Sequence, residues 1–268
     1  MLKADRGRDT LIVEVVTCRK SPPGRRESAT RQLEGLPLAV ESEFVDGFVG
    51  EDPIVDTLYD EAANARNCKR GLSRAEIGIY ASHRLAWQRL LDRGDAAALL
   101  LEDDFFFRDP ALVEAILRNW KALLGDDRDI VKLFDFERKS SNVPVLSERI
   151  AGIELVKWRS PTAGMVAYLI SRDGARKLLA RDRIFRPVDE DIKYFWELDL
   201  NVWSAPGNPV TEISGDLGGS LVNHERERVK QRVLIRSLWG NLLTLDRKIR
   251  TRLLLAREKR AKNARKPF

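Results

Sequence analysis

Three adjacent acidic residues follow a run of apolar residues in the first half of the chain. Leu99–Phe107 reads LLLEDDFFF, so Glu102, Asp103 and Asp104 stand between three leucines and three phenylalanines. Adjacent carboxylates repel one another, and burying them is costly unless a cation or hydrogen-bond donors offset their charge. Such a cluster can hold a hard divalent cation, which can in turn hold a diphosphate. The alternative interpretation is a solvated turn, and a second acidic triplet, Asp189–Asp191, has the same two interpretations.

The elements around the first triplet predict an open, mostly parallel α/β sheet flanked by helices. The apolar run 95–101 is typical of a parallel strand that is covered on both faces. Before it, Ser73 and Glu76 form a capping box and Gly94 a C-terminal cap, which predicts a largely buried helix. The alternation continues with strands expected at 11–17, 130–136 and 164–171 and helices expected from Pro110 and over 172–181. Ligands of such sheets bind outside the carboxyl ends of the strands, where the first triplet would lie.

The composition divides the chain into two units of opposite charge. Of 268 residues, 43% are hydrophobic, which is enough for a sizeable core, and the net charge is +6. Residues 225–268 carry 15 Lys or Arg and 4 Asp or Glu, a net of +11, which leaves −5 for the remainder. Nucleic acid is therefore a weak inference for the body, since a domain-wide basic footprint is missing. We expect a body over residues 1–222 and a basic amphipathic helical tail over 223–268.

The sequence also leads to expectations about the cellular compartment and about what the tail binds. Only two cysteines occur, Cys18 and Cys68, without CxxC spacing, which indicates a reducing compartment. The early apolar run LIVEVV is too short for a secretion signal. We expect a cytoplasmic protein, peripheral on the inner face of the cell membrane if the tail binds anionic lipid. The equal alternative for the tail is a helix docked on the body, and RNA binding is a distant third.

Several segments, taken in order, resemble glycosyltransferase family 25. The most specific is SRAEIGIYASHRLAWQRLLDRGDAAALLLEDDF; the others are SPPGRRES, FVDG, TAGMVAYLISRDGARKLL and PVDEDI. Together they cover about residues 11–220, and one departure is Arg74-Ala75 where a glycine often precedes Glu76. The resemblance implies a GT-A-like fold for residues 1–222, a sugar-nucleotide donor, most often UDP-galactose, and Mn²⁺ (or Mg²⁺) as the metal. It also implies inversion at the anomeric carbon and a saccharide or lipid-linked saccharide acceptor.

The resemblance assigns roles to the acidic residues. Asp104 would hold the metal with Glu102, and Asp103 or Glu102 would contact the ribose. Asp189 would take the proton from the acceptor hydroxyl, with Glu190 and Asp191 as competitors. The alternative for that second triplet is an acidic helix N-terminus favoured by the helix dipole.

Basic and neutral residues receive expectations as well. Arg25 and Arg26, in a loop expected over residues 18–28, suit the geometry of a diphosphate or are solvated loop charges. Ser82 and His83 would orient the metal loop or the donor, although a buried histidine is more often structural. Lys132 would reach a phosphate or is a surface lysine at a strand edge.

Two rival functions use the same residues. The first is a metal-dependent phosphohydrolase or nucleotidyltransferase. The second is a non-catalytic, membrane-associated scaffold with a degenerate glycosyltransferase fold. Binding of a UDP-sugar would favour the glycosyltransferase. Nucleotide hydrolysis without an acceptor would favour the phosphohydrolase or nucleotidyltransferase, and absence of donor binding would favour the scaffold.

Overall fold

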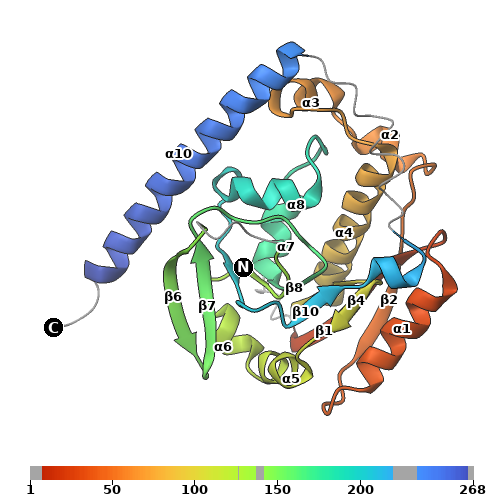
Figure 1. Cartoon of the computed structure of the whole chain (residues 1–268). Coiled ribbons are helices and arrows are strands. Elements are labelled where there is room, and N and C mark those ends of the chain that lie inside the picture. The colour runs from red at the N-terminus through yellow and green to blue at the C-terminus, as the bar shows by residue number, and fades with distance from the viewer. Residues whose placement is uncertain (1–7, 126, 137–141, 220–233, 265–268) are drawn as a thin grey trace, which may run out of the picture.

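A large mixed sheet forms the centre of the molecule (Figure 1). The computed structural model describes residues 8–125, 127–136, 142–219 and 234–264. In spatial order the eight strands are β2 (Ser42–Gly47), β1 (Arg8–Cys18), β3 (Asp95–Glu102), β8 (Ala167–Ser171), β5 (Ile130–Lys132), β9 (Val202–Ser204), β7 (Ile153–Trp158) and β6 (Pro144–Ile150). The pairings make β8 and β7 antiparallel to the other six strands. The expected open, mostly parallel sheet is confirmed, with β8 reversed at its centre.

Helices cover both faces of this sheet. They are α1 (Pro23–Glu34), α2 (Ile54–Leu58), α3 (Glu61–Asn67), α4 (Arg74–Arg93), α5 (Pro110–Arg118), α6 (Trp120–Leu124), α7 (Arg172–Leu179), α8 (Val188–Asp191), α10 (Leu234–Ala264) and the 3₁₀-helices η1 (Ile192–Glu197) and η2 (Ser214–Leu217). Successive strand residues point to opposite faces, so Leu99 packs in the core on the α5 and α6 side. Leu100 packs on the other side with Tyr80 and Trp87 of α4. The continuous apolar run thus reflects a strand buried on both faces.

The long helix α4 begins and ends where the sequence predicts. The Ser73 side chain accepts a hydrogen bond from the Glu76 backbone N–H at 3.2 Å, and the Glu76 carboxylate accepts from the Ser73 N–H at 3.0 Å. Gly94 closes the helix with a φ of 74°, a left-handed conformation that glycine adopts without strain. Because α4 is fixed at both ends, the residues in its middle are held in one orientation beneath the carboxyl ends of β1 and β3.

The expected loop over residues 18–28 is wrong in its second half. The helix α1 begins at Pro23, immediately after Pro22. Proline suits the first turn of a helix because its missing N–H has no partner there in any case and its φ is already helical. Arg25 and Arg26 therefore lie in the first turn of a helix and point in different directions.

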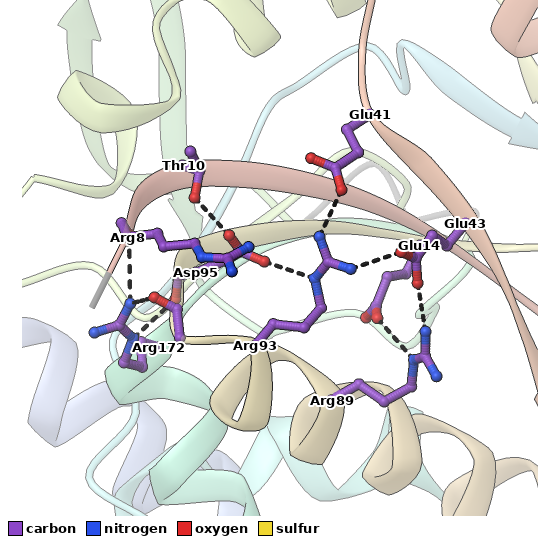
Figure 2. Close-up of polar contacts among 10 residues, drawn as sticks. Arg8, Thr10, Glu14, Glu41, Glu43, Arg89, Arg93, Asp95 and Arg172 are labelled. Carbon is purple, nitrogen blue, oxygen red and sulfur yellow. Dashed lines mark hydrogen bonds and ion pairs between the residues drawn. The ribbon is translucent and has the colours of Figure 1, made fainter. Parts of the chain in front are cut away.

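A network of ion pairs ties α4 to the amino-terminal half of the sheet (Figure 2). Arg93 contacts Glu41, Glu43 and Asp95 at 2.6–2.8 Å. Arg89, one turn earlier, lies 3.3 Å from the fully buried carboxylate of Glu14. Asp95 is the first residue of β3 and Glu102 its last. The contact between Arg93 and Asp95 therefore lies at the end of β3 away from the acidic triplet, whereas Glu14, in register with Leu100, lies nearer to the triplet.

The C-terminal helix α10 runs along the outside of the molecule, from α3 to β6 (Figure 1). No helix in the described parts of the chain combines the length and the apolar composition that a bilayer span requires. The segment 220–233, which includes the expected boundary at residue 222, lies outside the described residues.

Candidate active site

The carboxyl ends of β1 and β3 open into a cavity of about 360 Å³. These strands are parallel neighbours, with Val16 opposite Glu102, so their ends meet at one edge of the sheet. The acidic triplet Glu102–Asp104 lines the cavity in the turn between β3 and β4 (Phe105–Phe107). The expected location of the triplet at the end of a buried strand is confirmed, because β3 ends at Glu102. Ligands of open α/β sheets bind at this edge.

Asp103 is held inside the protein by both of its carboxylate oxygens. Its Oδ2 accepts a hydrogen bond from Thr17 Oγ1 at 2.6 Å, and its Oδ1 accepts from the Arg25 guanidinium at 2.8 Å. Its backbone N–H donates to the Val16 carbonyl at 3.0 Å. These contacts fix the turn that carries Glu102 and Asp104. Asp103 also lines the cavity, so ribose contact by Asp103 or Glu102 stays a prediction.

Asp104 carries the least satisfied carboxylate of the site. Its Oδ2 lies 3.1 Å from Arg25, while its Oδ1 is buried and has no hydrogen-bond partner among the described residues. Burial raises the pKa of Asp104 to about 7, and the charge of Glu102 adds to this shift, whereas the Arg25 guanidinium opposes it. Carboxylate oxygens of this kind are the ligands that a hard divalent cation takes.

The two arginines of the first α1 turn have separate functions. Arg25 is buried, bridges Asp103 and Asp104, and donates to the Gly219 carbonyl at 2.7 Å. Arg26 lies on the exposed side, where it pairs with Asp46 at 2.6 Å and covers the Phe44 ring. The expectation that both arginines bind a diphosphate is therefore corrected, because only Arg25 lines the cavity.

A hydrogen-bonded chain leads from the core to Glu102. Trp87 Nε1 donates to Tyr168 Oη at 2.9 Å, and Tyr168 Oη lies 2.9 Å from His83 Nδ1. His83 Nε2 lies 3.3 Å from Glu102 Oε1. If the tyrosine hydroxyl donates to Nδ1, the imidazole proton is on Nε2 and is directed at Glu102. Trp87 and Tyr168 are thus core residues, and His83 is buried with its Nε2 beside Glu102. The role of His83 in orienting the metal loop or the donor stays a prediction.

Ser82 holds the loop after β2 against α4. Its hydroxyl accepts from the Phe48 backbone N–H at 2.8 Å and donates to the Gly78 carbonyl at 2.8 Å. A Cβ on Gly47 would lie 2.3 Å from this hydroxyl, so the close approach depends on glycine. Ser82 lines the cavity, but its hydrogen bonds serve the wall rather than a ligand.

The second acidic triplet divides into three environments on α8. Asp189 lines the cavity. Glu190 is instead paired with Lys193 at 2.5 Å, and Asp191 is buried among Tyr80, Arg181 and Arg186. Asp189 lines the cavity and its two competitors do not. All three acids also lie in the first turn of α8, so the alternative of an acidic helix N-terminus describes where the triplet stands.

Lys132 lies outside the cavity. Its Nζ is buried, 2.5 Å from Asp135 Oδ1, and donates to the Thr162 carbonyl at 2.9 Å. Neither expectation for this residue, phosphate ligand or surface lysine, describes what it contacts. It neutralises a buried aspartate at the end of β5.

Glu212 and Ser214 line the cavity although the sequence did not indicate them. Glu212 ends β10 (Val210–Glu212) and Ser214 lies two residues beyond it. The strand pairs with β4 in a separate two-stranded sheet, which brings Glu212 opposite Phe105. The Ile213 backbone N–H also donates to the Asp104 carbonyl at 2.9 Å. No local pattern in the short segment VTE marks it, since its position depends entirely on this long-range pairing.

The site fits a cation that arrives with a diphosphate better than a preformed metal cage. Among the residues that the structure describes, no three side chains of the metal-binding types gather as a ligand group. Small divalent cations such as Mg²⁺ are often held by one or two carboxylates together with substrate phosphates. Glu102 and the unpartnered oxygen of Asp104 supply such a pair.

Comparison with known proteins agrees with this geometry. The family model described as "Glycosyltransferase family 25 (LPS biosynthesis protein)" matches residues 16–192. The chain is 32% identical over 169 residues to mouse "Inactive glycosyltransferase 25 family member 3", covering 54% of this chain and 27% of that protein. It is 30% identical over 167 residues to Xenopus laevis "Procollagen galactosyltransferase 1-B", covering 54% of this chain and 26% of that protein.

The matched region includes every acidic residue that lines the cavity except Glu212. The chain spans about a quarter of the length of these two relatives, one of which is named inactive and the other a galactosyltransferase. The family match covers most of this chain, and the resemblance seen in the sequence is confirmed. The chain belongs to glycosyltransferase family 25.

Proposed function

We propose that the chain is a metal-dependent inverting glycosyltransferase. It would move a sugar, with galactose from UDP-galactose as the first candidate, onto a hydroxyl of a saccharide or lipooligosaccharide acceptor. The observation that supports this most is the pair Glu102 and Asp104 at the carboxyl end of β3, with one Asp104 oxygen buried and unpartnered among the described residues. A relative named a procollagen galactosyltransferase supports galactose as the first sugar to test.

The proposed chemistry assigns each cavity residue a task. The transition state resembles an oxocarbenium ion, and negative charge grows on the leaving diphosphate. Glu102 and Asp104 would hold a divalent cation, which would supply Lewis-acid stabilisation of that charge. Arg25 adds a fixed positive charge beside them, and His83 holds Glu102 in place. Asp189, on a different element of the wall, would accept the proton of the acceptor hydroxyl.

A donor screen tests the proposal. The Tm is measured with Mn²⁺ and each of several UDP- and GDP-sugars, with the Asp104→Asn variant as the matched control. A donor at 100 times its Kd stabilises the folded state by about 2.7 kcal/mol. We expect a UDP-sugar to raise the Tm only when Mn²⁺ is present and only in the unsubstituted chain. Transfer to a saccharide acceptor is then assayed with the donor that binds.

A non-catalytic member of the family is the second candidate. Two observations favour it: a relative that is named inactive, and an arginine that already neutralises Asp103 and Asp104. Donor binding with neither transfer nor hydrolysis would support this candidate. Donor hydrolysis at the same rate with and without acceptors would instead support a phosphohydrolase.

A further inference from the structure

The helix α10 has an inner face that is attached to the body. Thr251 and Leu255 are buried against it. Glu258 pairs with Lys157 at 2.7 Å, and Trp239 Nε1 donates to the Arg66 carbonyl at 2.7 Å. The expected alternatives for the tail, docking on the body or on lipid, are therefore not exclusive, because docking uses only one side of the helix.

The opposite face of α10 presents a stripe of large apolar side chains. Leu242, Leu245, Ile249 and Leu253 are 58%, 54%, 48% and 57% exposed. Their spacing of three, four and four residues places them on one side of a helix, about half a turn from Thr251. The stripe is thus neither scattered surface leucines nor part of the attachment. We call these four residues the outer stripe.

Basic side chains flank the outer stripe on both sides. Projected around the helix, Lys248, Arg252 and Lys259 lie along one side and Arg250 and Arg257 along the other, all of them exposed. The exposed acid of this face, Asp246, is paired with Arg250 at 2.9 Å. The outer face therefore combines an apolar centre with positive edges.

We propose that this outer face of α10 binds an anionic lipid surface with the helix axis in the plane of the membrane. Basic amphipathic helices bury their apolar side in the boundary between headgroups and acyl chains, and their cationic edges attract anionic headgroups. A helix of 31 residues is about 46 Å long, so the outer face offers an extended line of contact. The proposal is independent of whether the cavity is catalytic.

The charge pattern favours lipid over two other partners. A second copy of the chain packed stripe to stripe would bring positive edges together, and like charges across such an interface are destabilising. A nucleic acid would match the charges, but it would leave the apolar stripe in water. An anionic membrane satisfies both components of the face at once.

The test uses the full chain and sedimentation with lipid vesicles. One set is phosphatidylcholine and the other an equimolar mixture with phosphatidylserine. We expect binding to the mixed vesicles alone at low salt, with release at high salt. Lys248→Gln with Arg252→Gln should weaken binding about 25-fold, taking roughly five-fold for each charge near an anionic surface. Leu245→Gln with Ile249→Gln should also weaken it and leave the salt dependence unchanged.

Matched substitutions elsewhere serve as controls. Arg108→Gln with Arg118→Gln removes the same charge from an exposed surface around α5, and Phe106→Gln removes an exposed aromatic side chain. Neither should change vesicle binding. The Tm of every variant is measured, and it should be unchanged because the substituted side chains are exposed.

Three results would overturn the proposal. The first is a folded protein that ignores mixed vesicles at low salt. The second is an equal loss of vesicle binding in the control variants, or no loss of binding on Leu245→Gln with Ile249→Gln. Either result would show that net charge alone accounts for the binding. The third is a concentration-dependent dimer that the stripe variants abolish without any vesicle binding, which would assign the face to a second copy of the chain.

Discussion

Arg25 gives the acidic turn a positive charge of its own. It contacts Asp103 and Asp104 at 2.8 and 3.1 Å, and all three side chains are buried. A buried carboxylate pair is otherwise costly, so this arginine lets the turn fold before any cation arrives. It also means that a cation must compete with a charge already present, and binding should therefore depend on the diphosphate that accompanies it.

Asp104→Asn tests the metal role. We expect transfer to fall by about 100-fold or more, as when one electrostatic contact to a developing charge is removed. The fold should be as stable or more stable above pH 7, because burial raises the pKa of Asp104 to about 7 and the folded state then carries a costly buried charge. Metal-dependent nucleotide affinity, measured from pH 6 to 8, should rise with pH in the original chain, since ligands must be deprotonated. Near-original activity in the variant would remove Asp104 from the metal site.

Asp189→Asn tests the base against a matched neighbour. Turnover should fall about 10²–10⁴-fold while donor affinity persists, because the base acts on the acceptor. Glu190→Gln is the control, since Glu190 points to Lys193 and should retain turnover. Both are measured as kcat and as Kd for the donor. Loss of donor affinity in Asp189→Asn would place that residue in the donor site instead.

The residues of the site were predictable to different extents. Asp104 and Glu102 could be placed because a buried strand run ends immediately before them. Glu190 and Asp191 could not be separated from Asp189, since their difference lies in partners such as Lys193 and Arg186 that come from packing. Lys132 has the sequence environment of an edge residue, but β5 is an interior strand and buries it.

At the scale of elements, sequence patterns predicted the helix ends correctly where the residues involved lie within one helical turn of one another. The capping box and Gly94 place both ends of α4, because each involves residues that are neighbours in the chain. Proline was misleading at α1, where Pro23 opens a helix instead of ending a loop. The direction of β8 was not predictable from its apolar pattern, because that pattern records burial and not the direction of its neighbours.

The ion pair between β1 and α4 should make stability depend on pH. Burial raises the pKa of Glu14 to about 7, and the Arg89 side chain opposes the shift. The folded state thus keeps a proton that the unfolded state releases near pH 4.5, so this residue lowers stability as the pH rises towards 7. Arg89→Gln should raise the pKa further and cost up to about 1.4 kcal/mol more at pH 8 than at pH 6, the worth of one pKa unit.

Urea denaturation at the two pH values measures this difference. Glu14→Gln in the same chain is the control, because a neutral side chain should remove the dependence. An equal loss at both pH values would show that Arg89 acts through Glu43 and packing rather than through the buried carboxylate.

At the scale of the whole molecule, α10 should support the body without being required for its fold. The residues of both hydrophobic core clusters come from positions before residue 220, whereas Leu255 of α10 is buried outside them. A chain ending at Asn223 should unfold cooperatively with a lower Tm and still bind donor, since burying one leucine contributes about 1.5–3 kcal/mol.

Lys157 supplies the control for that shortened chain. Its partner Glu258 is lost with α10, so the lysine loses the carboxylate that neutralises its charge. Lys157→Met should recover part of the lost Tm in the shortened chain and little in the full one. A shortened chain without a cooperative transition would instead make α10 part of the folding unit.

The order of the strands also determines how the protein emerges from the ribosome. β8 lies between β3 and β5 in the sheet, yet it follows both in the chain. At synthesis rates of 5–20 residues per second, roughly 3–14 s separate the end of β3 from the end of β8. During that time the apolar edge of β3 has no partner on the β8 side, and such edges associate with other chains. Nascent chains that stop before Ala167 should therefore aggregate, and their yield should depend on chaperones that cover exposed strands.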